Sequence, residues 1–483
     1  MTKSYLLTLL PLALCATVPA ATFVYVNNDT APNSVSAYSV ASNGALTELS
    51  GSPFPTGGAG NQGVGWIAAN RIRSVIANHK LFVANSGSHD ISVMSIDPAT
   101  GELNLVPGSP FAVTNSALGT LTLAATPDGK YLYAGDRLSS KIFSFSVAAS
   151  GALTPIGSPL TVPLSPNGMV IAPTDGRLLA VVSSSANSIE TYFITPGTGI
   201  LSPVTGSPFA GPAGADAGVD CNCAQDRLFV GAGPMIGAYS IDPTGALLPI
   251  TGSPFAVPVI NANSVVLSPD DTKLFAGGGF FDSSVDAFTV ASSPVKGALS
   301  PGSAFATGAL GANAVATDIE GKWLFVGDHL DNKISVFNIN STTPWLTPVP
   351  GSPFPNSVSD ALLTSLTVYP PKDCCPAPVI SNVSASPTSL WPPNHKFVNV
   401  TIGYTVTEPC PDTCVLTVAS NEPVDDPSGD WMVLDPHHVM LRADRLGDGT
   451  GRIYTITVIC TNNSNGLSSG HTVTVVVPHD KGQ

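Results

Sequence analysis

The sequence predicts an all-β protein: a seven-bladed β-propeller whose first and last strands share one blade, followed by an immunoglobulin-like β-sandwich. Three observations lead to this prediction. A Gly-Ser-Pro-Phe tetrapeptide recurs as far as residue 354, and short apolar runs alternate with turn residues between its copies. Beyond residue 379 the pattern changes to longer strands in which every second residue is apolar.

The tetrapeptide sets the length of the repeat. Its seven copies begin at Gly51, Gly108, Gly157, Gly206, Gly252, Gly302 and Gly351, with Leu160 replacing Phe and Ala304 replacing Pro in two of them. The starts are 46 to 57 residues apart. This period is typical of one supersecondary unit per repeat, so seven copies predict seven units.

Each repeat has room for four strands. In one of them, Arg227–Val230, Gly237–Ile241 and Ala246–Ile250 are apolar or aromatic runs separated by Gly, Asp, Pro and Asn. Turns such as Pro127-Asp128-Gly129 follow the first strand of a repeat, because Pro presets φ and Gly tolerates the bend. Four-stranded units repeated at this spacing predict a β-propeller.

The two ends of the repeat region predict how the ring closes. The first repeat, 23–54, has room for only three strands, whereas 362–369 is an apolar run left over after the seventh tetrapeptide. We expect this late run to be the inner strand of the first blade, because pairing it with Phe23–Val26 removes an exposed sheet edge.

Several segments resemble a known family. Lys80–Asn85, Ile91–Asp97 and Lys130–Ala134 are similar to segments of the seven-bladed lactonase-like propellers, which include 6-phosphogluconolactonase and carboxymuconate-cyclase type enzymes and YVTN-repeat surface proteins. The resemblance covers about residues 23–369. It implies the fold, and for activity it implies either a lactone-directed enzyme or a noncatalytic surface module.

The composition limits the function. The net charge is −14 with a pI near 4.8, which argues against a nucleic-acid partner, since such a partner favours a basic face, and likewise against binding to an anionic membrane. Charged residues make up only 11% of the chain, so its surface is expected to be largely neutral Ser, Thr, Asn and Gly.

The first 20 residues are typical of a secretory signal peptide. An apolar run from Tyr5 to Val18 ends in small residues, and cleavage is expected after Ala20. The run is shorter than a transmembrane span, and the bulky Leu14 argues against a lipid anchor at Cys15. We therefore expect a secreted, cell-surface or periplasmic protein without a transmembrane segment in its mature chain.

The expected domains are a propeller at 21–370, a Pro/Cys-rich linker at 371–378 and an immunoglobulin-like sandwich at 379–483. Val398–Val406 alternates apolar and polar residues as a half-buried strand requires. Trp391–Lys396 and Ser420–Pro423 resemble accessory Ig-like or HYR-like modules of secreted bacterial proteins.

Strand parity predicts one disulfide. Cys414 and Cys460 each share a strand face with apolar residues, so we expect them to pair inside the sandwich, with Cys410 as a rival partner for Cys460. The remaining cysteines, Cys221, Cys223, Cys374 and Cys375, have no assigned partners. They lack zinc-ligand companions, so a structural role is favoured over a metal site.

One set of candidate functional residues comes from the loops between the second and third strands of the blades. These loops share one face of a propeller and offer as candidate catalytic residues His89, Asp136, Arg137, Asp328 and His329. The alternative is that they are ordinary polar turn residues.

A second set marks the start of the innermost strand in successive repeats. We expect a partial ring of oxygen-bearing side chains at one mouth of the channel, formed by Asn167, Asp216, Asn263 and Asn313. Such oxygens suit a polar ligand, and Ca²⁺ is the cation they would accept. The alternative is that each Asn satisfies the backbone where the chain enters the strand. No metal site and no cofactor are assigned.

Two functions remain open. The sparse charge favours a noncatalytic extracellular binding module for a small molecule, a glycan or a surface protein. The alternative is a lactone hydrolase or cyclase, which would need a His or Glu together with an Arg in one cleft.

Overall fold

The computed structural model of the protein describes residues 21–61, 74–113, 120–163, 165–172, 176–183, 187–258, 261–279, 281–359, 361–363, 365–372, 374, 378–407, 412–423, 429–447, 449–462 and 468–480. The predicted signal peptide lies outside this range. Every described element is a β-strand, and the strands form nine sheets. No helix among the described residues is long and apolar enough to cross a membrane.

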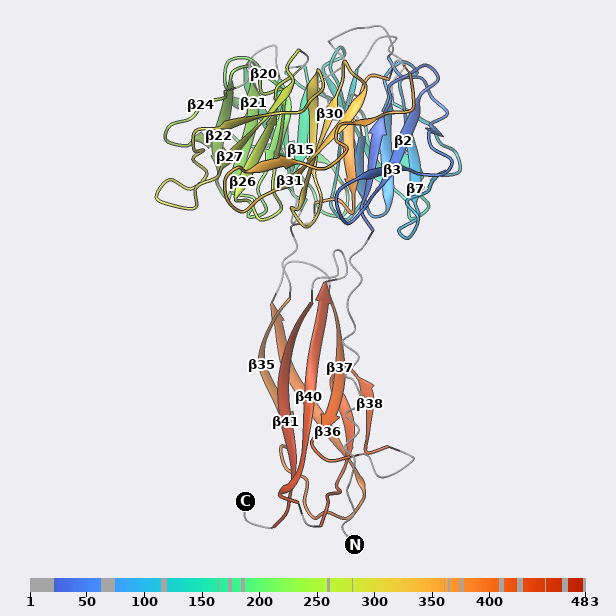
Figure 1. Ribbon diagram of the computed structural model, residues 1–483, viewed down its shortest axis with the longest axis vertical. Helices are drawn as coiled ribbons and strands as arrows, with labels where there is room; N and C mark the ends of the chain where they lie inside the picture. Colours follow the sequence, from blue (N-terminus) through green and yellow to red (C-terminus); the bar gives the residue numbers. More distant parts are fainter. Residues whose placement is uncertain are drawn as a thin grey trace.

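Seven of the sheets are the blades of a ring, as the repeat count predicted (Figure 1). In each blade four antiparallel strands follow one another from the inside of the ring outward. From blade 1 to blade 7, the inner strands are β34 (Ser365–Tyr369), β5 (Ser74–Ala77), β10 (Leu121–Ala125), β15 (Gly168–Ile171), β20 (Ala215–Cys221), β25 (Ser264–Leu267) and β29 (Ala312–Thr317). The second strands are β1 (Phe23–Asn27), β6 (Lys80–Asn85), β11 (Tyr131–Asp136), β16 (Leu178–Ser183), β21 (Arg227–Ala232), β26 (Lys273–Gly277) and β30 (Trp323–Asp328).

The outer half of each blade follows the same order. The third strands are β2 (Ser34–Val40), β7 (Asp90–Ile96), β12 (Lys141–Val147), β17 (Ser188–Ile194), β22 (Met235–Ile241), β27 (Ser284–Thr289) and β31 (Lys333–Ile339). The outer strands are β3 (Leu46–Glu48) with β4 (Phe54–Pro55), β8 (Leu103–Leu105) with β9 (Phe111–Ala112), β13 (Leu153–Pro155) with β14 (Leu160–Thr161), β18 (Leu201–Pro203) with β19 (Phe209–Ala210), β23 (Leu247–Pro249) with β24 (Phe255–Ala256), β28 (Ser303–Ala306), and β32 (Leu346–Pro348) with β33 (Phe354–Pro355).

The ring closes through blade 1, as the sequence predicted. β34, from the end of the repeat region, pairs antiparallel with β1, from its beginning, and Phe23 lies opposite Tyr369. β1 pairs on its other side with β2, so blade 1 contains strands from both ends of the repeat region. Every described inner strand therefore has a partner within its own blade.

The tetrapeptide interrupts the outer strand. In blade 2, Gly108 adopts a φ of 90°, and the hydroxyl of Ser109 accepts a hydrogen bond from the backbone N–H of Val93 in the third strand at 2.9 Å. Phe111 then begins the second half of the outer strand and packs against a core shared by blades 2 and 3. The serine thus satisfies the donor that the broken strand leaves unpaired, and the phenylalanine joins neighbouring blades.

The strand directions define two faces of the ring. On the upper face the inner strands begin and the second strands end, whereas the lower face carries the turns between inner and second strands. β34 ends at the lower face, and the chain continues from there into the C-terminal sheets (Figure 1). The loops that carry the predicted catalytic residues therefore lie on the face opposite the C-terminal sheets.

The last two sheets form a β-sandwich. One contains β35 (Val379–Ser386), β36 (Phe397–Thr407), β39 (His438–Arg442) and β38 (Trp431–Asp435), and the other contains β37 (Asp412–Ser420), β40 (Gly451–Asn462) and β41 (Ser468–Pro478). Their inner faces share one apolar core that includes Val400, Leu441, Ile456 and Val475. An immunoglobulin-like topology for this sandwich stays a prediction.

A disulfide and the ion pairs of a buried arginine lie in the sandwich. Cys414 and Cys460 lie opposite each other on β37 and β40 and form a disulfide, the pairing that their strand parity predicts, whereas the rival Cys410 lies outside the described residues. Arg452, 1% exposed, ion-pairs with Asp430 at 2.5 Å and with Glu422 at 3.2 Å.

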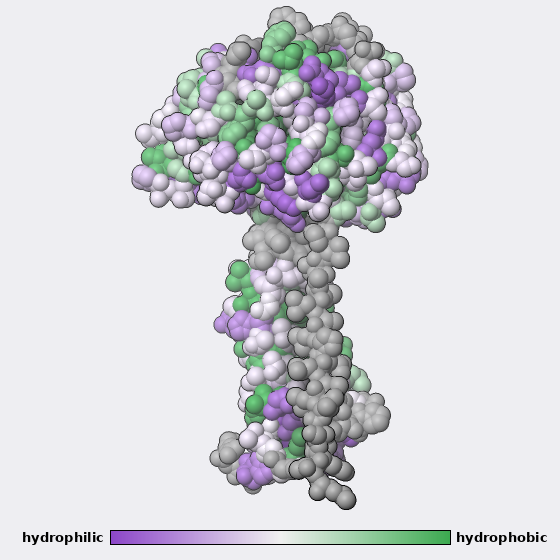
Figure 2. Space-filling view, in the orientation of Figure 1, coloured by the Kyte–Doolittle hydropathy of each residue, from purple (hydrophilic) through white to green (hydrophobic). Residues whose placement is uncertain are grey.

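The surface agrees with the low charge of the sequence. In Figure 2 the visible face of the ring is largely pale, with hydrophilic and hydrophobic residues scattered in small groups. The described surface in this view thus mixes hydrophilic and hydrophobic residues, and charged residues make up only 11% of the whole chain.

Candidate functional site

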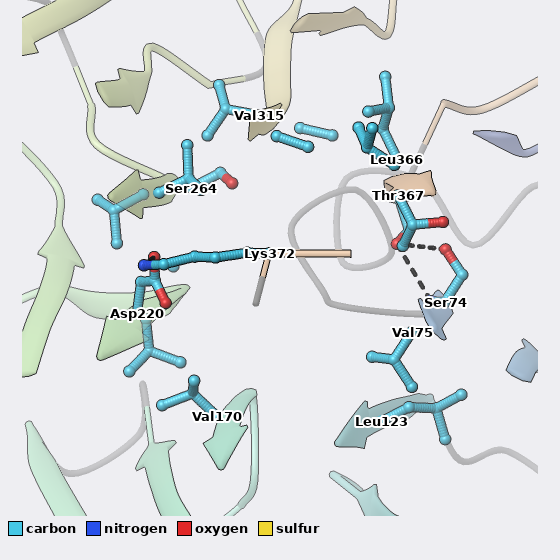
Figure 3. A pocket seen from close by; sticks show the side chains of 18 of the residues that line it. Ser74, Val75, Leu123, Val170, Asp220, Ser264, Val315, Leu366, Thr367 and Lys372 are labelled. Carbon is cyan, nitrogen blue, oxygen red and sulfur yellow. Dashed lines mark hydrogen bonds and ion pairs between the residues drawn. The ribbon is translucent and has the colours of Figure 1, made fainter. Parts of the chain in front are cut away.

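A channel runs through the centre of the ring. The inner strands of all seven blades surround a cavity of about 320 Å³. Its walls are mainly apolar, since Val75, Leu123, Val170 and Val315 project into it from four different blades (Figure 3). Alternate residues of an inner strand face the channel, so the apolar residues of these strands determine its lining.

The predicted ring of oxygen-bearing residues lies at the upper face. Asn263 and Asn313 line the channel, and Asn167 is buried with 1% exposure. The backbone N–H groups of Asn167 and Asn263 bond to carbonyls of the adjacent second strands, as expected where a chain enters a sheet. Asp216 lies in β20, but its side chain is outside the described part of the structure. Ligand binding by this group stays a prediction.

Two of the predicted catalytic carboxylates end second strands and are fully buried. Asp136 ends β11 and accepts a hydrogen bond from the Ser139 hydroxyl at 2.7 Å. Asp328 ends β30 and accepts one from the Ser335 hydroxyl at 2.6 Å. Burial raises the pKa of Asp328 to about 7, although hydrogen bonds from Ser335 and Thr307 oppose the shift. Asp328 therefore titrates near neutral pH.

The other three candidates lie in upper-face loops. His89 is half-buried between β6 and β7 and has a φ of 57°. Arg137 is half-buried after β11, and His329 is 5% exposed after β30. The blade 3 pair of Asp136 and Arg137 is separated from the blade 7 pair of Asp328 and His329 by blades 1 and 2. The five residues thus share a face of the ring without forming one compact group.

Asp328 also takes part in a hydrogen-bond network between blades 6 and 7, which the sequence analysis did not identify. The hydroxyl of its partner Ser335 also lies 3.0 Å from the carbonyl oxygen of Thr307, which follows the outer strand of blade 6, so the two acceptors share its single proton. The same arrangement joins blades 1 and 2. There the Asn85 amide donates to Ser92, and Thr56 donates to Asn85 at 2.9 Å.

A third copy closes the ring between blades 7 and 1, where Asn28 bonds to Ser36 and Asn356. The members of these inter-blade triads, grouped by junction, are Thr56, Asn85 and Ser92; Thr307, Asp328 and Ser335; and Asn356, Asn28 and Ser36. The recurrence of a polar residue at the end of the second strand and a serine in the third was visible in the repeat and could have revealed them.

Two further buried acids occupy the position of these serines in other blades. Glu190 in blade 4 is 2% exposed and accepts a hydrogen bond from the Tyr192 hydroxyl, and Asp286 in blade 6 is fully buried. The sequence analysis did not select either residue, because these third strands are buried on both faces and alternation therefore gives no signal. They add buried carboxyls to the same level of the ring.

One charged pair lies at the lower end of the channel. Asp220 of β20 and Lys372, which follows β34, both line the cavity (Figure 3). Neither was among the predicted site residues. Among the described residues that line the channel there is no His, Glu or Arg.

The family comparison agrees with the architecture. Residues 81–215 match the family model described as "Lactonase, 7-bladed beta-propeller". A 6-phosphogluconolactonase from Pectobacterium carotovorum is 28% identical over 125 residues, which are 26% of this chain and 37% of that protein. The chain thus aligns with little more than a third of the length of this relative.

Solved structures share the fold over a longer range. A Bacteroides fragilis protein described as a candidate 6-phosphogluconolactonase is 18% identical with a TM-score of 0.60, covering 73% of this chain and 99% of that one. A periplasmic gluconolactonase from Pseudomonas aeruginosa is 16% identical with a TM-score of 0.55, covering 69% of this chain and 97% of that one. At this level of identity the likeness is evidence for the fold alone.

Proposed function

Because residues 81–215 match a lactonase β-propeller family model, we propose that the protein is an exported lactone hydrolase that acts at the upper end of the channel. The structural observation that carries the proposal is Asp328, a buried carboxyl with a pKa raised to about 7 at the upper end of β30, directly before His329. The lactone-hydrolysing activity comes from the 6-phosphogluconolactonase that aligns with this chain over 37% of its own length, and it is proposed here for this chain.

The chemistry requires a proton acceptor that works near neutral pH. A lactone opens when water attacks its carbonyl carbon, and the group that takes the proton of this water is most effective with a pKa near the ambient pH. Asp328 meets this condition, and His89 and His329 are further proton acceptors on the upper face. Arg137 lies across blades 1 and 2 from Asp328 and His329, so this proposal gives it no contact with the reacting carbonyl.

A second candidate function is a noncatalytic binding module for an extracellular small molecule, glycan or surface protein. The observation that favours it is the lining of the channel, in which the described residues include no His, Glu or Arg. Asp136 and Asp328 also already hold hydrogen bonds within the ring, which restricts their part in catalysis. Asn263 and Asn313 would then contact the polar ligand, with Ca²⁺ as an alternative occupant.

Export is part of the proposal. The first 20 residues have the pattern of a signal peptide, and the disulfides Cys223–Cys374 and Cys414–Cys460 are bonds that persist in an oxidising compartment. Both observations support a secreted, cell-surface or periplasmic location.

The test is hydrolysis of a panel of sugar and aliphatic lactones by the mature protein, with and without EDTA. We expect turnover that falls in Asp328→Asn and His329→Ala and persists in Asp128→Asn, a control in a lower-face turn. Turnover that is unchanged in both upper-face variants would remove these residues from the mechanism. Absence of turnover, together with saturable heat on titration with the same lactones, would favour the binding module.

A further inference from the structure

The segment that follows β34 enters the lower end of the channel. Pro371 and Lys372 line the cavity, and the Lys372 side chain, 15% exposed, extends across the channel toward Asp220 (Figure 3). Its Nζ lies 3.6 Å from a carboxylate oxygen of Asp220 and 3.8 Å from one of Asp271. A lysine from the linker thus forms ion pairs with blades 5 and 6 together.

The two carboxylates are held in place by backbone donors. Asp220 accepts hydrogen bonds from the N–H groups of Cys221 at 2.8 Å and Leu267 at 2.7 Å. Asp271, in the turn between β25 and β26, accepts one from the N–H of Cys223 at 2.8 Å. The acidic pair is therefore fixed by the fold of blades 5 and 6, and a cation inserted between its members offsets their repulsion.

The same segment is attached to the ring covalently. Cys374, two residues after Lys372, forms a disulfide with Cys223 in the lower turn of blade 5, across a sequence separation of 151 residues. Lys372 is therefore confined between the end of β34 at Tyr369 and the disulfide at Cys374. Because the segment is already confined, the backbone around Lys372 loses less conformational entropy when the lysine inserts into the channel.

We propose that residues 371 and 372 are a plug that closes the lower end of the central channel, with Lys372 bound in an ammonium site made by Asp220 and Asp271 and with the Cys223–Cys374 disulfide as its latch. Ligands then enter the ring from the upper face only. The inference concerns the end of the channel opposite the proposed catalytic residues and holds whether or not the protein hydrolyses lactones.

Opening the latch requires a reductant. A dithiol such as dithiothreitol attacks the Cys223–Cys374 bond through one thiolate and completes the exchange through its second thiol. The two cysteines gain two electrons and two protons and become thiols, and the dithiol becomes a cyclic disulfide. After this step the two ion pairs and the short connection to β34 still hold Lys372 in the channel, but the covalent tie to blade 5 is gone.

The ammonium site is tested by chemical rescue with the disulfide intact. Lys372→Ala removes the three methylene groups and the ammonium that reach the carboxylates, and we expect a lower thermal midpoint because Asp220 and Asp271 lose their cation. Propylammonium chloride should restore the midpoint, whereas propanol and an equal concentration of sodium chloride should not. Equal effects of all three solutes, or no loss in Lys372→Ala, would overturn the ammonium site.

The latch is tested with Cys221 as the reporter. This thiol is 2% exposed, is not disulfide-bonded and precedes Cys223 by two residues. In the variant Cys223→Ser/Cys374→Ser, we expect alkylation of Cys221, followed by peptide mapping, to be at least ~10-fold faster than in the wild-type protein at a temperature below both unfolding transitions. Matched circular dichroism spectra check that the ring is folded. Cys221 protection equal to wild type would overturn the latch.

Discussion

The side-chain amide of Asn356, after the last outer strand of blade 7, donates a hydrogen bond to Oδ1 of Asn28 in blade 1 at 2.9 Å. The two residues are 328 positions apart, and both are buried. Asn356 also donates to Asn332 and accepts from the Tyr38 hydroxyl. The closure of the ring thus combines the β1–β34 strand pairing with a side-chain network at the upper face.

Replacing Asn28 should loosen this junction. Asn28→Ala leaves Asn356 and Ser36 without one partner each in a buried place, so we expect a loss of about 2–3 kcal/mol in the free energy of unfolding. Urea unfolding of the purified protein measures it. Asn43→Ala, in an exposed turn of the same blade, serves as the control. A loss in Asn28→Ala no larger than that of the control would show that the network adds nothing to the strand pairing.

The ring could be predicted because its signals are local and repeated. The interval between tetrapeptides gives the repeat length, the turn residues separate the strands, and the unpaired run before Tyr369 identifies the closing strand. The role of the tetrapeptide itself depends on a contact between strands that the repeat pattern does not show. Its serine accepts from the third strand, so the sequence shows that Ser109 recurs but does not identify Val93 as its partner.

The serine of the tetrapeptide should contribute more to the free energy of unfolding than an exposed serine or threonine does. In Ser109→Ala the N–H of Val93 loses its acceptor at the break in the outer strand, and we expect a loss of about 1–2 kcal/mol in unfolding free energy. Thr154→Ala, on the exposed outer strand of blade 3, is the matched control. Hydrogen exchange at the Val93 amide reports the same site directly, and unchanged protection there would contradict the assigned role.

Asp328 should make the stability of the ring dependent on pH. Its folded-state pKa is raised from 3.8 to about 7, so the neutral carboxyl is favoured in the folded state. Its contribution is complete below pH 3.8 and is lost as the pH rises to about 7, with a total change of about 2–4 kcal/mol. Asp328→Asn keeps a polar group in place without the titration, so its melting temperature should exceed that of wild type at pH 8 and match it at pH 4.

The control for this prediction is Glu102→Gln, which removes an exposed carboxyl from blade 2. Melting temperatures of the three proteins across pH 4 to 8 give the comparison. If the difference between wild type and Asp328→Asn does not grow with pH, Asp328 is ionised throughout this range. That result would also remove the argument for Asp328 as a base that works near neutral pH.

The site was harder to predict than the fold because its contacts join distant positions. Lys372 meets Asp220 and Asp271 only because the last inner strand closes blade 1 and the disulfide directs the linker back to blade 5. No spacing in the sequence encodes this approach. The upper-face candidates were predicted because they hold equivalent positions in successive repeats. Equivalent positions lie at the same height in the ring, but they do not show which side chains come together.

The buried ion pairs of Arg452 should be essential to the sandwich. Arg452 lies at the beginning of β40, and its guanidinium contacts the carboxylates of Asp430 and Glu422 and donates to the hydroxyl of Tyr454. Arg452→Met preserves much of the apolar volume but leaves two carboxylates buried without a cation. We expect a loss of about 3–5 kcal/mol in the unfolding free energy of the sandwich, because breaking one side of a buried pair uncovers the full desolvation cost.

A triple variant separates the charge effect from the packing effect. Adding Glu422→Gln and Asp430→Asn to Arg452→Met removes the uncompensated charges, so part of the lost stability should return. The ring transition should stay at its wild-type temperature in both variants, since Arg452 lies in β40 of the sandwich and pairs with residues outside the blades. If the triple variant is no more stable than Arg452→Met, lost packing of the arginine rather than unpaired charge accounts for the effect.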